Sequence, residues 1–332
     1  MDRTAVVRAW VTFARGKTQR ADAQAYAFDL EAHLEQVYQE LATRTYRHGP
    51  YRMFVRCDPK RRVIAVPSVR DQIVHRIVVD AIGFGFERTF HPHSYASRPE
   101  RGVLAAAQTV HRWIAHCSDG GRQQCWALRM DVRSFFASVD HAALTDLLVR
   151  RAPAEWIWLC ERIIGSFGEV HDDRRRGLPL GNVTSQLFAN VYLHELDRFV
   201  AHDLRVRRYA RYMDDWIIVH RDRDVLKRAA ERCRIFLREA LRLEAPVSKT
   251  WITPVHRGVD WLGFVLLPHH RVLRQATMRR MRHRIRSRVF DRLDRGLPYD
   301  NLRSTFASYD GLLRHGMHGH ERDRLLALQQ CC

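Results

Sequence analysis

The chain has 332 residues and carries 56 Lys plus Arg against 37 Asp plus Glu, which gives a formal net charge of +19 at pH 7. With 46% hydrophobic residues it can bury a core, so intrinsic disorder is excluded, and its length favours two lobes over one small domain. The charged residues are mixed along the whole length, so the positive excess belongs to the folded surface. We expect a polyanionic partner, and nucleic acid is the first candidate.

The apolar stretches do not predict a membrane span. The most apolar N-terminal stretch, residues 73–86, is interrupted by His75, Arg76 and Asp80, whereas a span needs about 20 uninterrupted apolar residues. The first residues lack the apolar core of a secretory signal, and the seven Cys contain no C-x-x-C pair. We therefore expect a cytoplasmic protein that binds no membrane and needs no disulfides.

The first half of the chain alternates between helical and strand patterns. In order, these patterns predict a helix over 23–41, a basic hairpin within 52–66, helices over 73–84 and 104–114, and a buried strand over 126–132. The hairpin turns at Asp58-Pro59-Lys60. The buried strand ends in Met130-Asp131-Val132, so it places a carboxylate at the end of an apolar run.

The second half continues the alternation and ends in a basic segment. Its patterns predict a loop over 177–182 that leads into a helix from Thr184, a hairpin with strands 209–212 and 216–219, a helix over 224–241, a strand pair ending at 261–264, and an Arg-rich helical remainder from Arg271. In that remainder, an apolar stripe lies beneath an Arg-rich face and consists of Met278, Met281, Ile285 and Val289. Such a face favours contact with phosphates rather than base readout.

Three aspartates stand where strands end or turn. Asp131 ends the strand at 126–132, and Asp214 and Asp215 lie in the tight turn of the 209–219 hairpin. Aspartate is common in turns, but two adjacent carboxylates beside buried strands are costly to desolvate unless cations compensate. Two Mg²⁺ ions could supply that compensation, and such a pair clamps the attacking and leaving oxygens of a phosphoryl displacement.

These residues resemble the motifs of reverse transcriptases. Tyr212-Met213-Asp214-Asp215 is similar to the Y-x-D-D signature, and Asp131 followed by Phe136 is similar to the first catalytic motif, D-x-x-x-x-F/Y. Residues 177–190 resemble the next motif, Lys249 the basic residue of the following one, and Trp261-Leu262-Gly263-Phe264 the primer-grip hairpin. The resemblance covers about residues 25 to 310.

Two details resemble one lineage, the reverse transcriptases of diversity-generating retroelements. Retroviral and group II intron relatives usually carry Pro-Gln-Gly and then Ser-Pro, whereas this chain has Pro179-Leu180-Gly181 and Ser185-Gln186. The stretches His48-Gly49-Pro50-Tyr51, 95–99 and 211–215 also resemble that lineage.

The resemblance implies an α+β fold of the right-hand polymerase class, with fingers, a palm that carries an antiparallel catalytic sheet, and a helical thumb. It implies N-terminal helices and fingers over 1–100, a palm over 101–264 with a finger insert at about 141–180 and the catalytic hairpin, and a basic helical thumb with a C-terminal tail over 265–332.

The resemblance also implies an activity and its partners. The enzyme would be an RNA-directed DNA polymerase that copies a template-repeat RNA into cDNA, with frequent errors at template adenines. It would bind template RNA, a cDNA or primer strand and dNTP, together with a pentameric accessory variability protein, in a bacterial host or encoded by a phage. Two Mg²⁺ ions, for which Mn²⁺ can substitute, would serve the nucleotidyl transfer.

The resemblance assigns site residues in groups. The catalytic residues would be Asp131, Asp214 and Asp215, which with Val132 would bind the metal. The nucleotide-binding residues would be Arg62, Val132, Phe136, Leu180, Gly181, Gln186 and Lys249. The residues in contact with primer or template would be Tyr212, Met213, Trp261, Leu262 and Gly263.

Several of these residues keep a second interpretation. Phe136 either lies beneath the sugar of the nucleotide and excludes a 2′-hydroxyl, or packs in the core beside Phe135. Arg62 either grips the triphosphate or belongs to a solvated hairpin. Lys249 either serves the leaving pyrophosphate or is a surface residue at a strand edge. Leu180 stands where accurate relatives have Gln, so we hypothesise that it promotes misincorporation.

Two other functional classes stay open. The same polymerase core could serve another bacterial retroelement or a phage-defence system. A catalytically silent RNA-binding remnant is the second alternative, although the intact aspartates disfavour it. A zinc site in the tail, from His315, His318, His320 and Cys331-Cys332, is disfavoured because the spacing matches no usual structural site.

Overall fold

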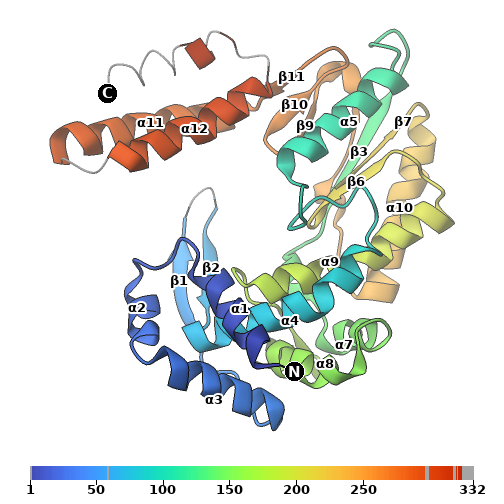
Figure 1. Ribbon diagram of the computed structural model, residues 1–332. Coiled ribbons are helices and arrows are strands. Elements are labelled where there is room, and N and C mark those ends of the chain that lie inside the picture. Colours follow the sequence, from blue (N-terminus) through green and yellow to red (C-terminus); the bar gives the residue numbers. More distant parts are fainter. Residues whose placement is uncertain (1, 58–59, 296–298, 317–318, 320, 324–332) are drawn as a thin grey trace. The chain divides into compact units, whose positions relative to one another are not determined.

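The computed structural model describes residues 2–57, 60–295, 299–316, 319 and 321–323 (Figure 1). The chain divides into two compact units, each assembled from separate stretches. The first unit comprises the described residues within Met1–Arg98, Asp131–Arg205 and Arg232–Val247, and the second those within Pro99–Met130, Val206–Glu231 and Ser248–Cys332. Of the tail residues considered for zinc, His318, His320, Cys331 and Cys332 lie outside the described residues.

The first unit begins with helices around a hairpin. Its elements up to residue 98 are α1 (Arg3–Ala14), α2 (Ala21–Ala27), α3 (Leu30–Ala42), β1 (Arg52–Arg56), β2 (Arg62–Val66) and α4 (Val69–Glu87). Helix α1 packs against α3 and α4, and β1 pairs with β2 antiparallel, as the sequence predicted for the basic hairpin. Helix α4 begins at the N-cap Ser68, whose hydroxyl accepts a hydrogen bond from the backbone N–H of Asp71.

The prediction of one helix over 23–41 was wrong, because the helix is interrupted between α2, which ends at Ala27, and α3, which begins at Leu30. Asp29 has non-helical dihedrals (φ −124°, ψ 56°) and precedes the first residue of α3. Phe28, which the helical spacing placed on the apolar stripe, is 95% exposed. An exposed aromatic residue between two helices fits the helical spacing of apolar residues although it does not pack into the core. The spacing alone therefore could not reveal the interruption.

The rest of the first unit is mainly helical. Its elements are α6 (Phe135–Ser138), α7 (His141–Val149), α8 (Ala154–Gly165), β4 (Glu169–His171), β5 (Arg174–Arg176), α9 (Val183–Arg198) and a π-helical turn (Phe199–Asp203). Helix α9 packs against α4 and α7, and α8 against α4 and α7. Besides α7 and α8, the segment expected as a finger insert at about 141–180 contains the antiparallel hairpin β4–β5.

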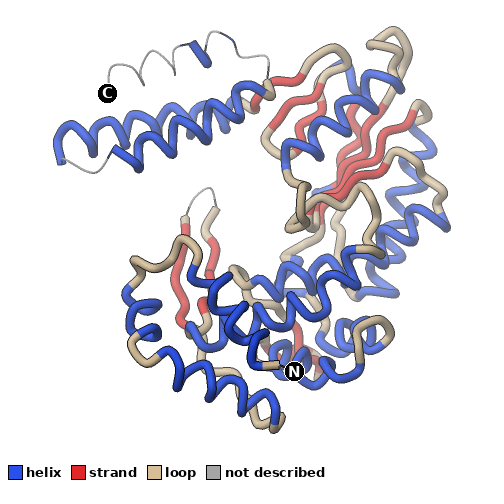
Figure 2. The backbone as a smooth tube through the Cα atoms, viewed as in Figure 1, coloured by secondary structure: helices blue, strands red, loops and turns tan. Residues whose placement is uncertain are grey.

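The second unit is built on a four-stranded sheet with the strand order β6-β7-β3-β8 (Figure 2). The strands are β3 (Trp126–Asp131), β6 (Tyr209–Tyr212), β7 (Asp215–His220) and β8 (Thr250–Pro254). Strands β6 and β7 pair antiparallel, as do β3 and β8. Helix α5 (Val103–Cys117) packs on β6 and β7, and the run of buried residues in the middle of β7 fits a strand covered on both faces.

A second, smaller sheet and the basic helix complete this unit. They comprise β9 (Val259–Trp261), β10 (Phe264–Leu266), β11 (Arg271–Leu273), α11 (Gln275–Arg295) and α12 (Tyr299–Arg314), and a short 3₁₀ turn at Val255–Arg257 precedes β9. Helix α10 (Arg223–Leu241) and the 3₁₀ turn at Val247–Lys249 each have residues in both units. The helix expected from Arg271 begins only at Gln275, because Arg271–Leu273 pairs with β10. In α11, Met278, Met281 and Ile285 are buried as predicted, whereas Val289, the last residue of the predicted stripe, is half-exposed.

Within the described part of the chain, no helix is long and apolar enough to span a membrane.

Candidate active site

The turn between β6 and β7 carries the aspartate pair. Tyr212 pairs with Asp215, so Met213 and Asp214 form a two-residue turn, and Met213 adopts a positive φ of 54°. The guanidinium of Arg211, which is fully buried, donates a hydrogen bond of 3.1 Å to the carbonyl oxygen of Met213. Burial also raises the pKa of the Tyr212 phenol, so its ring is neutral. A buried cation therefore fixes the backbone of the turn just before Asp214.

Asp215 is held by two residues that are distant in the sequence. The Nε and Nη2 atoms of Arg129, on β3, donate hydrogen bonds of 3.0 and 2.7 Å to its two carboxylate oxygens. The indole Nε1 of Trp261, on β9, donates a further bond of 3.0 Å. A fork of two parallel bonds fixes the plane of a carboxylate as well as its position. Arg129 is a site residue that the sequence analysis missed.

Asp131 lies at the end of the strand that carries Arg129. The two residues are two positions apart on β3, so their side chains leave the strand on the same face. Strand β3 is hydrogen-bonded to β7, which begins at Asp215. The strand order therefore places β3, whose last residue is Asp131, next to β7, whose first residue is Asp215.

The carboxylates of the aspartate pair suit Mg²⁺, although the protein side chains alone do not form a complete set of metal ligands. Within the described ranges, no three His, Cys, Asp or Glu side chains are arranged to hold a metal ion. Oxygen ligands are nevertheless those that Mg²⁺ prefers, and it commonly uses only one or two protein carboxylates besides water and substrate phosphates. The residues present therefore fit the ion.

In the first unit, backbone hydrogen bonds join three of the predicted motifs. The N–H of Leu178 donates to the carbonyl of Phe136 at 2.6 Å, and the N–H of Gly177 donates to the carbonyl of Val139 at 2.9 Å. The N–H of Ala65 on β2 donates to the carbonyl of Leu180 at 3.1 Å. The basic hairpin, the Phe136 turn and the 177–181 loop thus form one framework.

The two neighbouring phenylalanines, Phe135 and Phe136, differ in exposure. Phe135 is 2% exposed and belongs to the core, whereas the neighbouring Phe136 is half-exposed and stands edge-on to it. Val132 is fully buried, so only its backbone is available to a ligand. Arg62 begins β2 and is exposed. Phe136 and Arg62 are therefore both accessible to a nucleotide.

The loop before α9 approaches the hairpin closely at Gly181. This residue has φ +108°, and a Cβ there would lie 2.9 Å from the Cγ2 atom of Ile64. Leu180 is half-exposed, and Gln186 in the first turn of α9 is exposed, whereas Ser185 is buried. Leu180 and Gln186 are thus the accessible side chains of this motif.

The remaining predicted residues lie in the second unit. Leu262 and Gly263 form the two-residue turn between β9 and β10, with φ values of +50° and +86°. Trp261, just before the turn, is buried and reaches Asp215, which links the predicted primer-grip hairpin to the aspartate pair. Lys249 is half-exposed, at the end of a 3₁₀ turn next to β8.

Comparison with known proteins defines the class. The family model of reverse transcriptase (RNA-dependent DNA polymerase) matches residues 57–266. The chain is 28% identical over 287 residues to protein YkfC of Escherichia coli K12, covering 75% of this chain and 73% of YkfC. It is 23% identical over 324 residues to the group II intron-encoded protein LtrA of Lactococcus lactis, covering 75% of this chain and 51% of LtrA.

A solved structure shows the same fold at low sequence identity. Telomerase from Candida albicans, solved with a fragment of telomeric RNA, matches with a TM-score of 0.50 and 11% identity over 81% of this chain and 56% of that chain. The fold is therefore that of the right-hand polymerases. The chain belongs to the reverse transcriptase family and is an RNA-directed DNA polymerase by class. It spans only about half the length of LtrA and of the telomerase.

Proposed function

We propose that this reverse transcriptase copies an RNA template into cDNA with low fidelity, as the enzymes of diversity-generating retroelements do. The observation that carries the proposal is Leu180. Its backbone is fixed by the hydrogen bond to Ala65 while its apolar side chain stays half-exposed beside Gly181. A Gln there could hydrogen-bond near the nucleotide sugar, whereas Leu offers only shape, so a mispaired nucleotide is rejected less strongly.

The nucleotidyl transfer would take place at the end of the catalytic sheet. Asp131, Val132, Asp214 and Asp215 would hold two Mg²⁺ ions, with Mn²⁺ able to substitute, and bound metal would stabilise the charge that develops on the transferred phosphoryl group. Arg129 and Trp261 keep the carboxylate of Asp215 in one orientation. The primer strand would lie along the hairpin turn and the Trp261-Leu262-Gly263 turn.

The nucleotide would be bound by the framework of the first unit. Arg62 would contact the triphosphate through its fork of donors, and Phe136 would lie under the sugar, where its ring excludes a 2′-hydroxyl. Leu180, Gly181 and Gln186 would face the nascent base pair. Lys249 would neutralise or protonate the leaving pyrophosphate.

The proposed partners follow from this chemistry. The template is an RNA, and the exposed arginines of α11 would bind the phosphates of the template–primer duplex. A pentameric accessory protein remains part of the proposal. If that protein is basic, a chain of net charge +19 cannot attract it by overall charge, so local acidic or apolar patches, or bridging RNA, must supply the contact.

A second candidate is a reverse transcriptase of another retroelement. The similarity to the group II intron protein LtrA favours it. Against it stand Leu180 and the Ser185-Gln186 pair, where such relatives usually carry Gln and Ser-Pro.

Sequencing of cDNA made on a mixed-sequence RNA separates the two candidates. The low-fidelity proposal expects errors concentrated at template adenines in the wild type and fewer in Leu180→Gln. Asp214→Asn is the control, because it should abolish incorporation of dNTP while RNA binding persists. Uniform fidelity in the wild type would favour another retroelement, and an error rate unchanged by Leu180→Gln would refute the role of Leu180.

A further inference from the structure

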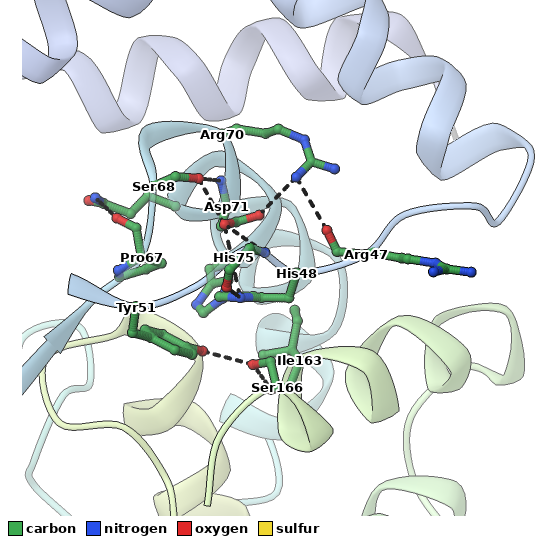
Figure 3. Close-up of polar contacts among 12 residues, drawn as sticks. Arg47, His48, Tyr51, Pro67, Ser68, Arg70, Asp71, His75, Ile163 and Ser166 are labelled. Carbon is green, nitrogen blue, oxygen red and sulfur yellow. Dashed lines mark hydrogen bonds and ion pairs between the residues drawn. The ribbon is translucent and has the colours of Figure 1, made fainter. Parts of the chain in front are cut away.

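A buried polar cluster in the first unit joins the segment at His48 to helix α4 (Figure 3). Its centre is a chain of hydrogen bonds through His48, His75 and Thr184, which we call the histidine chain. The Nε2 atoms of the two histidines are 3.0 Å apart, and the Nδ1 atom of His75 is 2.9 Å from the hydroxyl of Thr184. His75 and Thr184 are each 1% exposed. The mechanism proposed above uses none of the three.

The direction of each bond follows from the first one. The Nδ1 atom of His48 is 2.6 Å from the carbonyl oxygen of Gly49, which can only accept, so Nδ1 donates. In a neutral ring the Nε2 atom of His48 then accepts, and His75 must donate to it. The Nδ1 atom of His75 is left as an acceptor, so the hydroxyl of Thr184 donates to it. Burial, and secondarily His48, lowers the pKa of His75 to about 3, which keeps this ring neutral.

One end of the histidine chain is fixed by Asp71 on α4. This carboxylate is fully buried and accepts hydrogen bonds from the hydroxyl groups of Tyr46 and Ser68, at 2.8 Å each. It also accepts a bond of 3.2 Å from the backbone N–H of Gly49. The turn that presents His48 is thus tied to the N-terminal turn of α4, and Figure 3 shows Asp71 at the centre of these bonds.

The other end reaches the first turn of α9. Thr184 is the second residue of this helix and follows Gly181 by three positions. In the described part of the chain, the side chain of the N-cap residue Asn182 caps no backbone N–H of α9. The first turn therefore lacks the usual local anchor, and the bond from Thr184 to His75 attaches it to α4 instead. Because α4 and α9 also pack against each other, this hydrogen bond fixes the position of the first turn of α9 relative to α4.

We propose that Thr184 and His75 are positioning residues of the nucleotide pocket. Their hydrogen bond sets where α9 begins and hence where Leu180 and Gly181 stand. The inference rests on the proposed binding of the nucleotide at these two residues. It gives His48 and Gly49 a supporting role at that site, although neither residue would touch the nucleotide.

The first test compares Thr184→Val with Thr184→Ser. Val keeps the shape but removes the donor, whereas Ser keeps the hydroxyl. Since a buried neutral hydrogen bond is worth up to about a tenfold change in an equilibrium, Thr184→Val should raise the KM for dNTP by roughly three- to tenfold. Thr184→Val should also shift the error spectrum, and its kcat should change less than its KM. Thr184→Ser, which keeps the hydroxyl, should have the KM and the error spectrum of the wild type.

A matched control removes a different bond of the same cluster. The hydroxyl of Tyr51 is 2.9 Å from that of Ser166, at the end of α8, and does not take part in the histidine chain. Tyr51→Phe should therefore leave the KM for dNTP and the error spectrum at the wild-type values. A rise equal to that of Thr184→Val would mean that any damage to the cluster has this effect, and would overturn the proposal.

A second variant tests the same bond from the other side and guards against misfolding of the first. His75→Gln can still offer an N–H near the position of Nε2, but it loses the Nδ1 acceptor of Thr184. If the two residues act through one bond, the double variant His75→Gln/Thr184→Val should raise KM no more than either single change. Additive effects, or wild-type KM and errors in Thr184→Val, would overturn the inference. Absence of dNTP incorporation by the wild-type protein would instead overturn the proposed function.

Discussion

The protonation of His75 should make the stability of this protein depend on pH. The ring has a pKa of about 3 in the folded chain, against 6.5 when unfolded, because burial disfavours its charged form. The unfolded chain therefore takes up a proton first as the pH falls, and the folded state loses stability below about pH 6.5. The loss approaches about 1.4 kcal/mol per pH unit, so it reaches about 2 kcal/mol between pH 8 and pH 5.

His75→Gln removes this titration, so the variant should lack that part of the pH dependence. Urea unfolding of both proteins at pH 8, 6.5 and 5 measures it as the difference between their free energies of unfolding. The variant should be the less stable protein at pH 8, because it loses the bond to Thr184, and the gap should narrow by about 2 kcal/mol at pH 5. Titratable groups away from His75 are present in both proteins, so they do not change this difference. A gap that stays constant with pH would refute the assignment of a neutral, buried His75.

Two further substitutions test the site. Gly181→Ala should destabilise the fold by roughly 1–3 kcal/mol and raise the KM for dNTP, because the added Cβ would meet Ile64 and the backbone has a positive φ. Thermal unfolding measures the first effect and steady-state kinetics the second. Gly85→Ala is the control: the added Cβ on α4 meets no described atom outside the helix's own backbone, so KM should stay unchanged and the fold should gain up to about 1 kcal/mol from the helix propensity of Ala. Arg129→Gln should slow single-turnover incorporation by roughly ten- to a hundredfold, because Asp215 loses its fixed orientation. Arg129→Lys, which keeps the positive charge, should be slowed less. A wild-type rate in Arg129→Gln would contradict this role of Arg129.

Much of the catalytic sheet could be predicted from the sequence. The β6–β7 hairpin and β3 are short apolar runs bounded by polar residues, and their aspartates fall in recognisable motifs. Strand β11 was not predicted because three residues are too few to show the alternation of apolar and polar side chains that marks a strand. In addition, its Arg271 fits the Arg-rich pattern of α11. Its pairing with β10, which no local pattern reports, decides the conformation.

The supporting residues could not be predicted because their roles depend on tertiary contacts. Arg129 acquires its role only when β3 lies beside β7, and Trp261 only when its side chain reaches Asp215. His75 was taken as an interruption of an apolar helix. Its position four residues after Asp71 was the available signal, since two polar residues on one face of a largely buried helix require partners.

The framework that joins the hairpin, the Phe136 turn and the loop before α9 is made of backbone groups. The carbonyls of Phe136 and Leu180 and the N–H groups of Leu178 and Ala65 would be present whichever side chains occupied these positions. Evolution can therefore exchange the residue at position 180 without moving the loop that carries it. Under the proposed role of Leu180, such a backbone framework would separate copying accuracy from catalytic architecture: a change of this one side chain would alter the error rate while the loop and the chemistry are preserved.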